Sequence, residues 1–137
     1  MKLESWGRYP KYPQAASPVW WPQQLDAAAL PQSFLPFGNG RSYGDVCLAS
    51  SNQLLTMRGL DRFVAFDRQT GVLRAEAGVT LGDILQVTVP AGWFLPVVPG
   101  TRLATLGGAI ANDVHGKNHH RQGTFGCHVN RFTTKYQ

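Results

Sequence analysis

Short apolar runs, separated by stretches that contain glycine, proline and asparagine, are the main pattern along this chain and predict strands. Three such runs have the length of single strands and lie at 33–37, 53–57 and 93–98. Two more, 63–66 and 72–77, flank the polar loop 67–71, which ends in glycine. Apolar runs on both sides of such a loop predict a β-hairpin.

One helix with defined ends is predicted at residues 81–89. Thr80 and Asp83 have the spacing of a capping box, although Asp stands where Glu or Gln is preferred. Pro90 cannot continue the helix, and so we expect the helix to end there. Residues 23–30 have helical composition as well. Strands and helices do not alternate regularly, and this order predicts an α+β fold, not a doubly wound one.

Two glycine-rich turns stand beside these apolar runs and are the candidates for ligand binding. The first, 38–45, reads GNGRSYGD, and its glycines allow positive φ values that bring several backbone N–H groups to one anion. The second, 99–102, reads PGTR and leads to Thr105, an N-cap residue before the small and apolar residues of 106–111. Two turns that suit phosphate groups predict a ligand with two phosphates, and we expect FAD.

The spacing of the first turn differs from that of two common nucleotide motifs. It is G-x-G-x-x-x-G, not the G-x-G-x-x-G of a Rossmann site, and no acidic residue follows a second strand to contact a ribose. The chain also lacks the G-K-[ST] of a P-loop. By itself this turn fits a plain structural turn as well as a ligand loop, and only the second turn favours a ligand.

Composition places the chain among globular domains. Its 137 residues are 43% hydrophobic and 15% charged, enough to bury a core and too apolar for a disordered chain. The formal charge of +5 suits an anionic ligand. No Lys/Arg cluster stands out, and the interleaved aromatic and basic residues of a nucleic-acid face are missing. We therefore expect no nucleic-acid partner.

The N-terminal residues and the cysteines bear on the compartment. Residues 1–17, rich in Pro, Tyr and Lys, are expected to be extended and lack the apolar region of a signal peptide. No run approaches the ~18 apolar residues of a membrane-spanning helix, and so the protein is expected in the cytoplasm or at the periphery of the inner membrane. Cys47 and Cys127 stand outside any C-x-x-C pair, which predicts two free thiols, with a single disulfide as the alternative.

A histidine-rich stretch raises the alternative of a metal site. His115, His119 and His120, with Cys127 and His128, supply enough side chains for four zinc ligands. His119 and His120 are adjacent, however, and project differently, and no second C-x-x-C or H-x-x-x-H element supports them. We therefore expect no metal.

The segments GNGRSYGD (38–45) and PGTRLATLGGAIANDVHGKNHH (99–120) together resemble the FAD-linked oxidases of the vanillyl-alcohol oxidase type, which have a PCMH-type FAD-binding domain. The resemblance covers about residues 36–129 and is closest to the sugar and lactone oxidases of that family. It implies the N-terminal part of such a domain: a small mixed or parallel β-sheet with flanking helices, and the start of the second subdomain. Residues 1–17 are then an extended N-terminal segment, and 18–137 a partial FAD-binding domain without the family's substrate domain and C-terminal segment.

The resemblance also implies which residues contact FAD. In the family the first loop embraces the pyrophosphate, and that role falls here on Gly38, Asn39, Gly40, Arg41, Ser42, Tyr43, Gly44 and Asp45. The second stretch is expected to line the other side of the cofactor through Gly100, Thr101, Thr105, Leu106, Gly107, Gly108, Asn112, Asp113, Val114 and His115. For Leu106 and Val114, simple core packing is the alternative.

The implied activity is FAD-dependent oxidation of a secondary alcohol on a sugar or lipid-linked sugar, in which a base takes a proton and the flavin a hydride. Tyr43, His115 and Lys117 are expected nearest the isoalloxazine or the substrate, with a solvated surface side chain as the alternative for Lys117. The general base is expected outside this chain, and no catalytic residue is assigned. Some relatives attach flavin covalently through a histidine in the first loop, where this sequence has Arg41, and so we expect a dissociable FAD.

Two alternative functions stay open at the level of sequence. The chain would serve as a truncated, non-catalytic flavin- or nucleotide-binding module if a partner polypeptide completed it. Uncovered apolar surface would then predict self-association. It would equally fit an aldonolactone or alditol oxidase of the same family, because the substrate domain decides between these activities.

Overall fold

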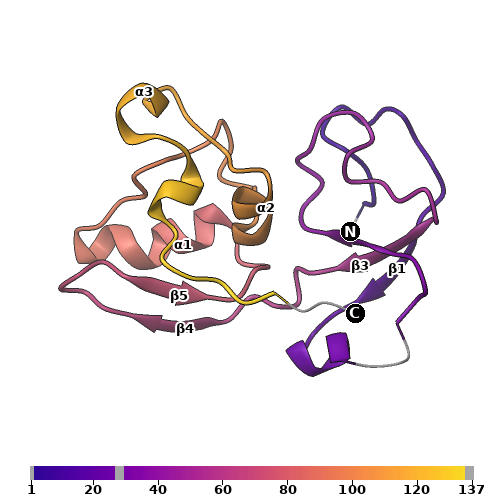
Figure 1. Ribbon diagram of the computed structural model, residues 1–137, viewed down its shortest axis with the longest axis horizontal. Helices are drawn as coiled ribbons and strands as arrows, with labels where there is room; N and C mark the ends of the chain where they lie inside the picture. Colours follow the sequence, from indigo (N-terminus) through magenta and orange to yellow (C-terminus); the bar gives the residue numbers. More distant parts are fainter. Residues whose placement is uncertain (1, 27–29, 135–137) are drawn as a thin grey trace. The chain divides into compact units, whose positions relative to one another are not determined.

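The computed structural model describes residues 2–26 and 30–134 (Figure 1). The chain divides after Leu60 into two compact units, unit 1 up to Leu60 and unit 2 from Asp61. Both strands and helices are present, which confirms the expected α+β class. Among the described residues, no helix has the length and apolar character needed to cross a bilayer.

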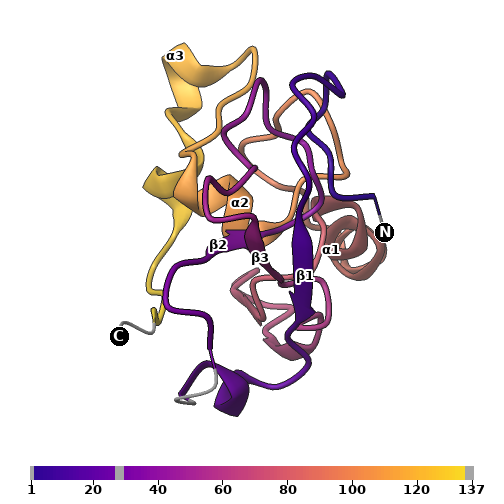
Figure 2. The same ribbon diagram turned by 90° about the vertical axis from the view of Figure 1, so that its right-hand side faces the viewer.

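Unit 1 is built on a three-stranded parallel sheet with the order β1-β3-β2 (Figure 2). Its elements are β1 (Ala15–Pro18), the 3-10 helix η1 (Pro22–Asp26), β2 (Leu35–Phe37) and β3 (Gln53–Thr56). The central strand β3 pairs through Gln53 with Ala15 of β1 and through Leu54 with Leu35 of β2. The strands predicted at 33–37 and 53–57 are thereby confirmed.

Two N-terminal elements differ from the sequence pattern. β1 was not predicted, because its sequence AASP has none of the β-branched or aromatic residues that indicate a strand. Of the helix predicted at 23–30, the structure has the 3-10 helix η1 as far as Asp26. Residues 27–29 lie outside the described residues.

Apolar side chains pack on both faces of the central strand of unit 1. Leu54 and Leu55 follow each other in β3 and therefore project to opposite faces of the sheet. Leu54 belongs to a buried cluster with Phe37, and Leu55 to a second cluster with Val19. Because both faces are covered, the strand has two apolar residues in succession and not an alternation of apolar and polar residues, as is usual for a buried parallel strand.

Unit 2 begins with the predicted hairpin. Strand β4 (Phe63–Phe66) pairs in antiparallel orientation with β5 (Leu73–Ala75). In the connecting loop, Asp67 Oδ1 accepts the backbone N–H of Gln69 at 2.8 Å and that of Thr70 at 3.2 Å. These two N–H groups hold the pKa of the Asp67 carboxyl below its ordinary value. The hairpin prediction is confirmed, down to its polar loop.

Trp93 supports this hairpin loop and does not begin the strand predicted at 93–98. Its indole Nε1 donates to the carbonyl of Arg68 at 2.7 Å. Its ring lies so close to Gly71 that a Cβ there would be 2.6 Å from the nearest ring carbon. The prediction of a strand here is wrong: residues 93–98 pair with no strand in the described part of the chain, since the backbone turns to seat the indole on the hairpin.

The helices of unit 2 begin at capped ends. They are α1 (Leu81–Thr88), η2 (Val89–Ala91), α2 (Leu106–Ala111), α3 (His119–Gln122) and η3 (Phe125–His128). The capping box is confirmed, because Asp83 N–H donates to Thr80 Oγ1 and Thr80 N–H to Asp83 Oδ2, both at 3.1 Å. Thr105 caps α2 by accepting the N–H of Gly108 at 3.1 Å. Thr80 and Thr105 form an isolated antiparallel bridge, and so the two helix starts lie side by side.

The core of unit 2 is formed by residues of α1, α2, η3 and the hairpin and of the loops between them (Figure 1). Leu73 and Ala75 of β5 pack against it from the hairpin. Its buried members are Val79, Leu81, Ile84, Val97, Ala109 and Phe125. The core therefore fixes the start of α2 and the segment around Val97, between which the second glycine turn lies.

Candidate functional site

The first candidate site is the loop 38–45 of unit 1, called here the glycine loop, which follows the end of β2. Gly40 and Gly44 adopt φ values of +64° and +58°, the left-handed conformation that glycine permits. Within the described residues, several of its backbone N–H groups donate to no other group: those of Gly40, Arg41, Tyr43, Gly44 and Asp45. A row of uncommitted N–H groups is suited to the oxygens of an anion.

The glycine loop is open to a ligand on one side and closed on the other. At Gly44 a Cβ would meet no atom within 4 Å, and the Tyr43 side chain is 78% exposed. At Gly40 a Cβ would collide with the carbonyl oxygen of Glu4. The loop therefore rests against the N-terminal residues and presents its other side to solvent.

Cys47 lies just beyond this loop and packs against the cluster around Phe37. Burial raises the pKa of its thiol, while its own N–H and that of Ser42 act in the opposite direction. The thiol is therefore protonated at neutral pH. Cys47 and Cys127 are both free, as the sequence led us to expect.

The second candidate stretch, in unit 2, uses the N–H groups of its helix start within the chain. Leu106 N–H donates to Val79 O at 2.7 Å, and Gly107 N–H to Ala77 O at 2.9 Å. The N–H of Gly108 donates to Thr105 Oγ1 at 3.1 Å. The first three N–H groups of α2 are therefore paired within the chain, and these residues stay predicted cofactor contacts.

Packing accounts for part of the small-residue pattern at this helix. A Cβ on Gly107 would lie 3.0 Å from the Ala77 Cβ, and so the glycine allows α2 to approach residue 77 closely. Leu106 and Val114 pack against the core of unit 2, which agrees with the alternative considered for them. Asn112 Nδ2 donates back to Gly108 O at 2.8 Å and extends the end of the helix.

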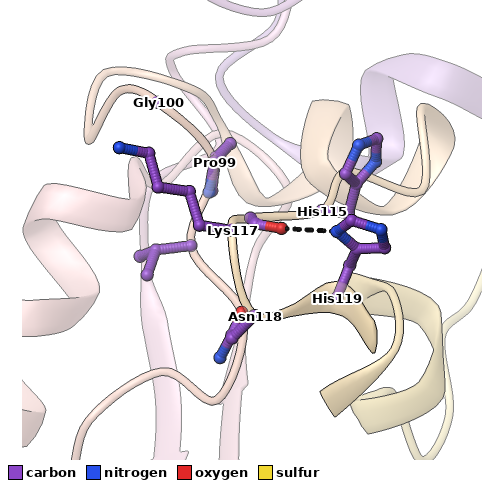
Figure 3. Close-up of a pocket in the computed structure, with 8 residues that line it drawn as sticks. Pro99, Gly100, His115, Lys117, Asn118 and His119 are labelled. Atoms are coloured by element: carbon purple, nitrogen blue, oxygen red, sulfur yellow. Dashed lines mark hydrogen bonds between the residues drawn. The ribbon is translucent and has the colours of Figure 1, made fainter. Parts of the chain in front are cut away.

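A concave site of about 630 Å³ lies in unit 2 beside these residues. Figure 3 shows its lining, which consists of Val98, Pro99, Gly100, His115, Gly116, Lys117, Asn118 and His119. Three residues predicted near the cofactor or the substrate, Gly100, His115 and Lys117, are thus brought together. Asn118 and His119 were not predicted, although both stand in the HGKNHH segment on which the resemblance rests.

Two contacts with backbone carbonyls hold the walls of this site together. Gly116 lies so close to Val98 that a Cβ would collide with the Val98 carbonyl oxygen. Asn118 Nδ2 donates to the carbonyl of Pro96 at 3.1 Å. The segments 96–100 and 115–119 are therefore packed directly against each other, with the site between their side chains.

The imidazoles and the lysine occupy opposite sides of the site (Figure 3). His119 Nδ1 lies 3.1 Å from Gly116 O, and its ring contacts the edge of the His115 ring at 5.3 Å between centroids. A carbonyl oxygen can only accept a hydrogen bond, and so His119 Nδ1 must carry the hydrogen of this contact. The other ring nitrogen, Nε2, takes no part in it. Lys117 extends away from both rings, toward the loop that carries Gly100.

Asp113 joins the end of α2 to η3. Its φ of +45° places it in the left-handed position after the helix, where Asp113 N–H donates to Ile110 O and Val114 N–H to Ala109 O, both at 3.1 Å, as in a Schellman motif. Its Oδ1 accepts the N–H of Gly126 at 2.8 Å. That N–H is the main reason why the pKa of the Asp113 carboxyl is low, and the Thr124 hydroxyl and the charge of His115 act in the same direction.

The Asp113→Asn variant is expected to make unit 2 less sensitive to acid. Because the folded-state pKa of Asp113 lies below its ordinary value of 3.8, its carboxylate stabilises the fold above that pH. This stabilisation is lost as the pH falls through the folded-state pKa, whereas an asparagine has no such loss. Urea unfolding at pH 7 and pH 3 should show a smaller drop for the variant, and equal drops would contradict this role.

The described residues contain no cluster of side chains that could bind a metal ion. No group of three or more His, Cys, Asp or Glu side chains in residues 2–26 and 30–134 is placed to hold a metal ion. His115, His119 and His120 contact one another through ring edges, at 5.3 and 5.9 Å between centroids. His128 Nε2 lies instead 2.8 Å from Gln122 O.

A family model described as an FAD binding domain matches residues 25–134. Among curated proteins, the decaprenylphosphoryl-beta-D-ribose oxidase of Mycolicibacterium smegmatis is 45% identical over 92 residues, which are 67% of this chain and 20% of that protein. The two segments that carry the resemblance, 38–45 and 99–120, lie within the residues 25–134 that the family model matches.

Solved structures show the same fold at low sequence identity. An alkyldihydroxyacetonephosphate synthase superposes with a TM-score of 0.58 at 20% identity, over 69% of this chain and 18% of that one. Aclacinomycin oxidoreductase superposes with a TM-score of 0.57 at 18% identity, over 80% of this chain and 23% of that one. The chain spans about a fifth of the length of these relatives.

Proposed function

Since this chain belongs to the family of FAD binding domains, we propose that it is the FAD-binding portion of a flavin-dependent oxidoreductase that oxidises a secondary alcohol on a sugar. The observation that carries the proposal is the row of uncommitted N–H groups in the glycine loop. Arg41, Tyr43, Gly44 and Asp45 are exposed, and so their N–H groups donate to water when no ligand is bound. An anionic ligand is a partner whose oxygens can replace that water.

Two features of the glycine loop support a pyrophosphate as its ligand. Gly44 leaves the backbone approachable, and the uncommitted N–H groups of the loop supply the donors. Arg41 adds a guanidinium that suits phosphate oxygens. We assign the pyrophosphate of FAD to this loop, and Asn39 and Ser42 to its margins.

The site in unit 2 is proposed to face the reacting end of the cofactor. FAD, when bound, supplies a hydride acceptor. The chain's own residues would orient the isoalloxazine and the substrate: Gly100 from one wall, and His115 and Lys117 from the other. Thr101, which follows Gly100, is assigned to the cofactor on the strength of the resemblance alone. Tyr43 of the glycine loop is assigned to the same task on the strength of the resemblance alone.

The name of one curated relative supports the proposed substrate class. The curated relative is an oxidase of decaprenylphosphoryl-β-D-ribose, and we propose a sugar or lipid-linked sugar substrate for the whole protein. A lipid-linked substrate would place the protein at the periphery of the inner membrane, which cell fractionation tests. Aldonolactone or alditol oxidation is the alternative within the family, and assays of the full-length enzyme on each substrate decide between them.

Non-covalent attachment and self-association belong to the same proposal. Arg41 stands where some relatives carry the histidine that bonds flavin covalently, and so acid precipitation should release all flavin from the protein.

Three apolar side chains of the hairpin are exposed, which favours contact with a second copy or a partner chain: Phe63, Val64 and Val72 are 38%, 57% and 49% exposed. Light scattering after size-exclusion chromatography measures that association.

The test of FAD binding is a thermal melt of the chain with excess FAD, FMN or riboflavin. A ligand at about 100 times its Kd adds about 2.7 kcal/mol to the stability of the folded state, which raises Tm by several degrees in a domain of this size. FAD should raise Tm more than FMN, and riboflavin least, because only FAD has the pyrophosphate. A cooperative melt that none of the three ligands shifts would refute the proposal.

A further inference from the structure

The N-terminal residues 3–14 form part of the wall behind the glycine loop. Trp6 N–H donates to Ser42 O at 3.0 Å, and the Glu4 carbonyl lies directly against Gly40. Leu3 packs into the cluster around Phe37. In Figures 1 and 2 this segment lies beside the loop in both views.

A side-chain clamp fixes the far end of the same segment. Gln14 Nε2 donates to Ala49 O, and Ala49 N–H donates to Gln14 Oε1, both at 3.1 Å. These paired bonds tie the segment to the residues that follow the glycine loop. Residues 3–14 lie outside the region 25–134 that matches the family model, and so their contact with the loop is a property of this chain's own structure.

Trp6 also contacts the one cationic side chain of the glycine loop. The guanidinium carbon of Arg41 lies 5.4 Å from the centroid of the Trp6 ring, within the range of a cation–π interaction. The Trp6 N–H donates to the carbonyl of Ser42, one residue after Arg41, and so the Trp6 main chain is tied beside the residue whose guanidinium its ring contacts. An arginine on an exposed loop otherwise samples many rotamers, and ordering it upon binding reduces affinity.

We propose that Trp6 is a positioning residue that holds Arg41 ready to bind the pyrophosphate of the dinucleotide. The inference rests on the proposed function, because it needs a phosphate ligand in the glycine loop. The indole face restricts the guanidinium without neutralising it, and this leaves its N–H groups available to phosphate oxygens. The N-terminal segment thereby contributes to cofactor affinity although no atom of Trp6 needs to touch the cofactor.

Replacement of Trp6 by leucine tests this role, with Tyr9→Leu as the matched control. Tyr9 is an aromatic residue of the same segment, and its side chain is 80% exposed. Trp6→Leu should weaken the binding of FAD and ADP, measured by calorimetry, about three- to tenfold, the range expected for an exposed cation–π contact that preorganises one side chain. Tyr9→Leu should leave both affinities unchanged, and Trp6→Phe should restore part of the loss.

A double-mutant cycle with Arg41→Gln separates positioning from general support of the fold. If Trp6 acts through Arg41, Trp6→Leu should have no further effect on FAD affinity once Arg41 is glutamine. A merely structural role would lower Tm and would weaken FAD binding equally in both backgrounds. Side-chain NMR of the free protein gives a second readout, since the ring-current shift of the Arg41 guanidinium should disappear in Trp6→Leu.

The outcomes distinguish this inference from the proposed function. If the unmodified chain binds FAD but Trp6→Leu binds it equally well, or has an effect additive with that of Arg41→Gln, the role of Trp6 is refuted and FAD binding stands. If the unmodified chain binds neither FAD nor ADP, the proposed function is refuted and this inference with it. If Trp6→Leu fails to fold, the affinity of Trp6→Phe in the two backgrounds decides.

Discussion

The Gly40→Ala variant is expected to lose FAD binding and to destabilise unit 1 by about 2–4 kcal/mol. Gly40 has a φ of +64°, a conformation that is unfavourable for alanine by about 1–2 kcal/mol. The added Cβ would also collide with the Glu4 carbonyl oxygen and lie 3.1 Å from Phe37 Cζ. Because the carbonyl belongs to the backbone, it cannot rotate away, and the N-terminal segment must move off the loop.

Two other glycines supply matched controls for Gly40. Gly44 has a φ of +58° but open space around its Cβ position, and so Gly44→Ala should show only the conformational part, about 1–2 kcal/mol. Gly7 has neither a positive φ nor an atom within 4 Å, and Gly7→Ala should be neutral. Urea unfolding and FAD titration of the three variants measure both effects. A Gly40→Ala variant no worse than Gly44→Ala would contradict the close packing of the segment on the loop.

The Phe37→Ala variant is expected to reduce the free energy of unfolding of unit 1 by about 3–5 kcal/mol. Phe37 is 0% exposed and forms the centre of the cluster with Ala49 and Leu54. Its carbonyl also accepts the N–H of Met57 at 2.9 Å, at the point where β2 passes into the glycine loop. Loss of the ring would leave a cavity directly under the loop, and a loss of this size is a large part of the roughly 5–15 kcal/mol typical of a whole domain.

Phe37→Leu is the control for this prediction. It keeps most of the buried apolar volume, and its effect should stay below about 1.5 kcal/mol. Hydrogen exchange of backbone amides in unit 1 and unit 2 after each substitution would show where protection is lost. An alanine variant that loses less than about 1 kcal/mol would mean that the side chain is not enclosed as the structure has it.

The sequence alone was sufficient for elements whose hydrogen bonds join residues a few positions apart. The capping box of Thr80 and Asp83 and the Asp67 turn of the hairpin were readable because donor and acceptor are close in the chain. Gly40 and Gly44 have the positive φ values expected of the glycine loop. The fold class and the family also followed from the sequence, since the two glycine-rich segments are long and specific.

Contacts between distant residues could not be predicted in this way. β1 exists because Ala15 pairs with Gln53, and a parallel pairing of this kind has no local signal in the sequence AASP. The strand predicted at 93–98 is wrong for the opposite reason: its apolar residues fit a strand, but Trp93 packs on the hairpin loop. Whether an apolar segment forms a strand depends on the strand it can pair with, and that partner lies at a distant position in the sequence.

In the candidate site, too, some features followed from the local sequence and others only from the tertiary structure. The sequence by itself determined which loop can present N–H groups to an anion, because glycines set the backbone conformation locally. Only the tertiary structure decided which N–H groups are left for a ligand. The N–H groups of Leu106 and Gly107 donate to backbone carbonyls of the chain, whereas those of Gly44 and Asp45 donate to no group in the described residues. The tertiary structure also placed Trp6 under Arg41. Hydrogen-bond partners and ring contacts of this kind depend on segments that fold together from distant positions, and no local pattern encodes them.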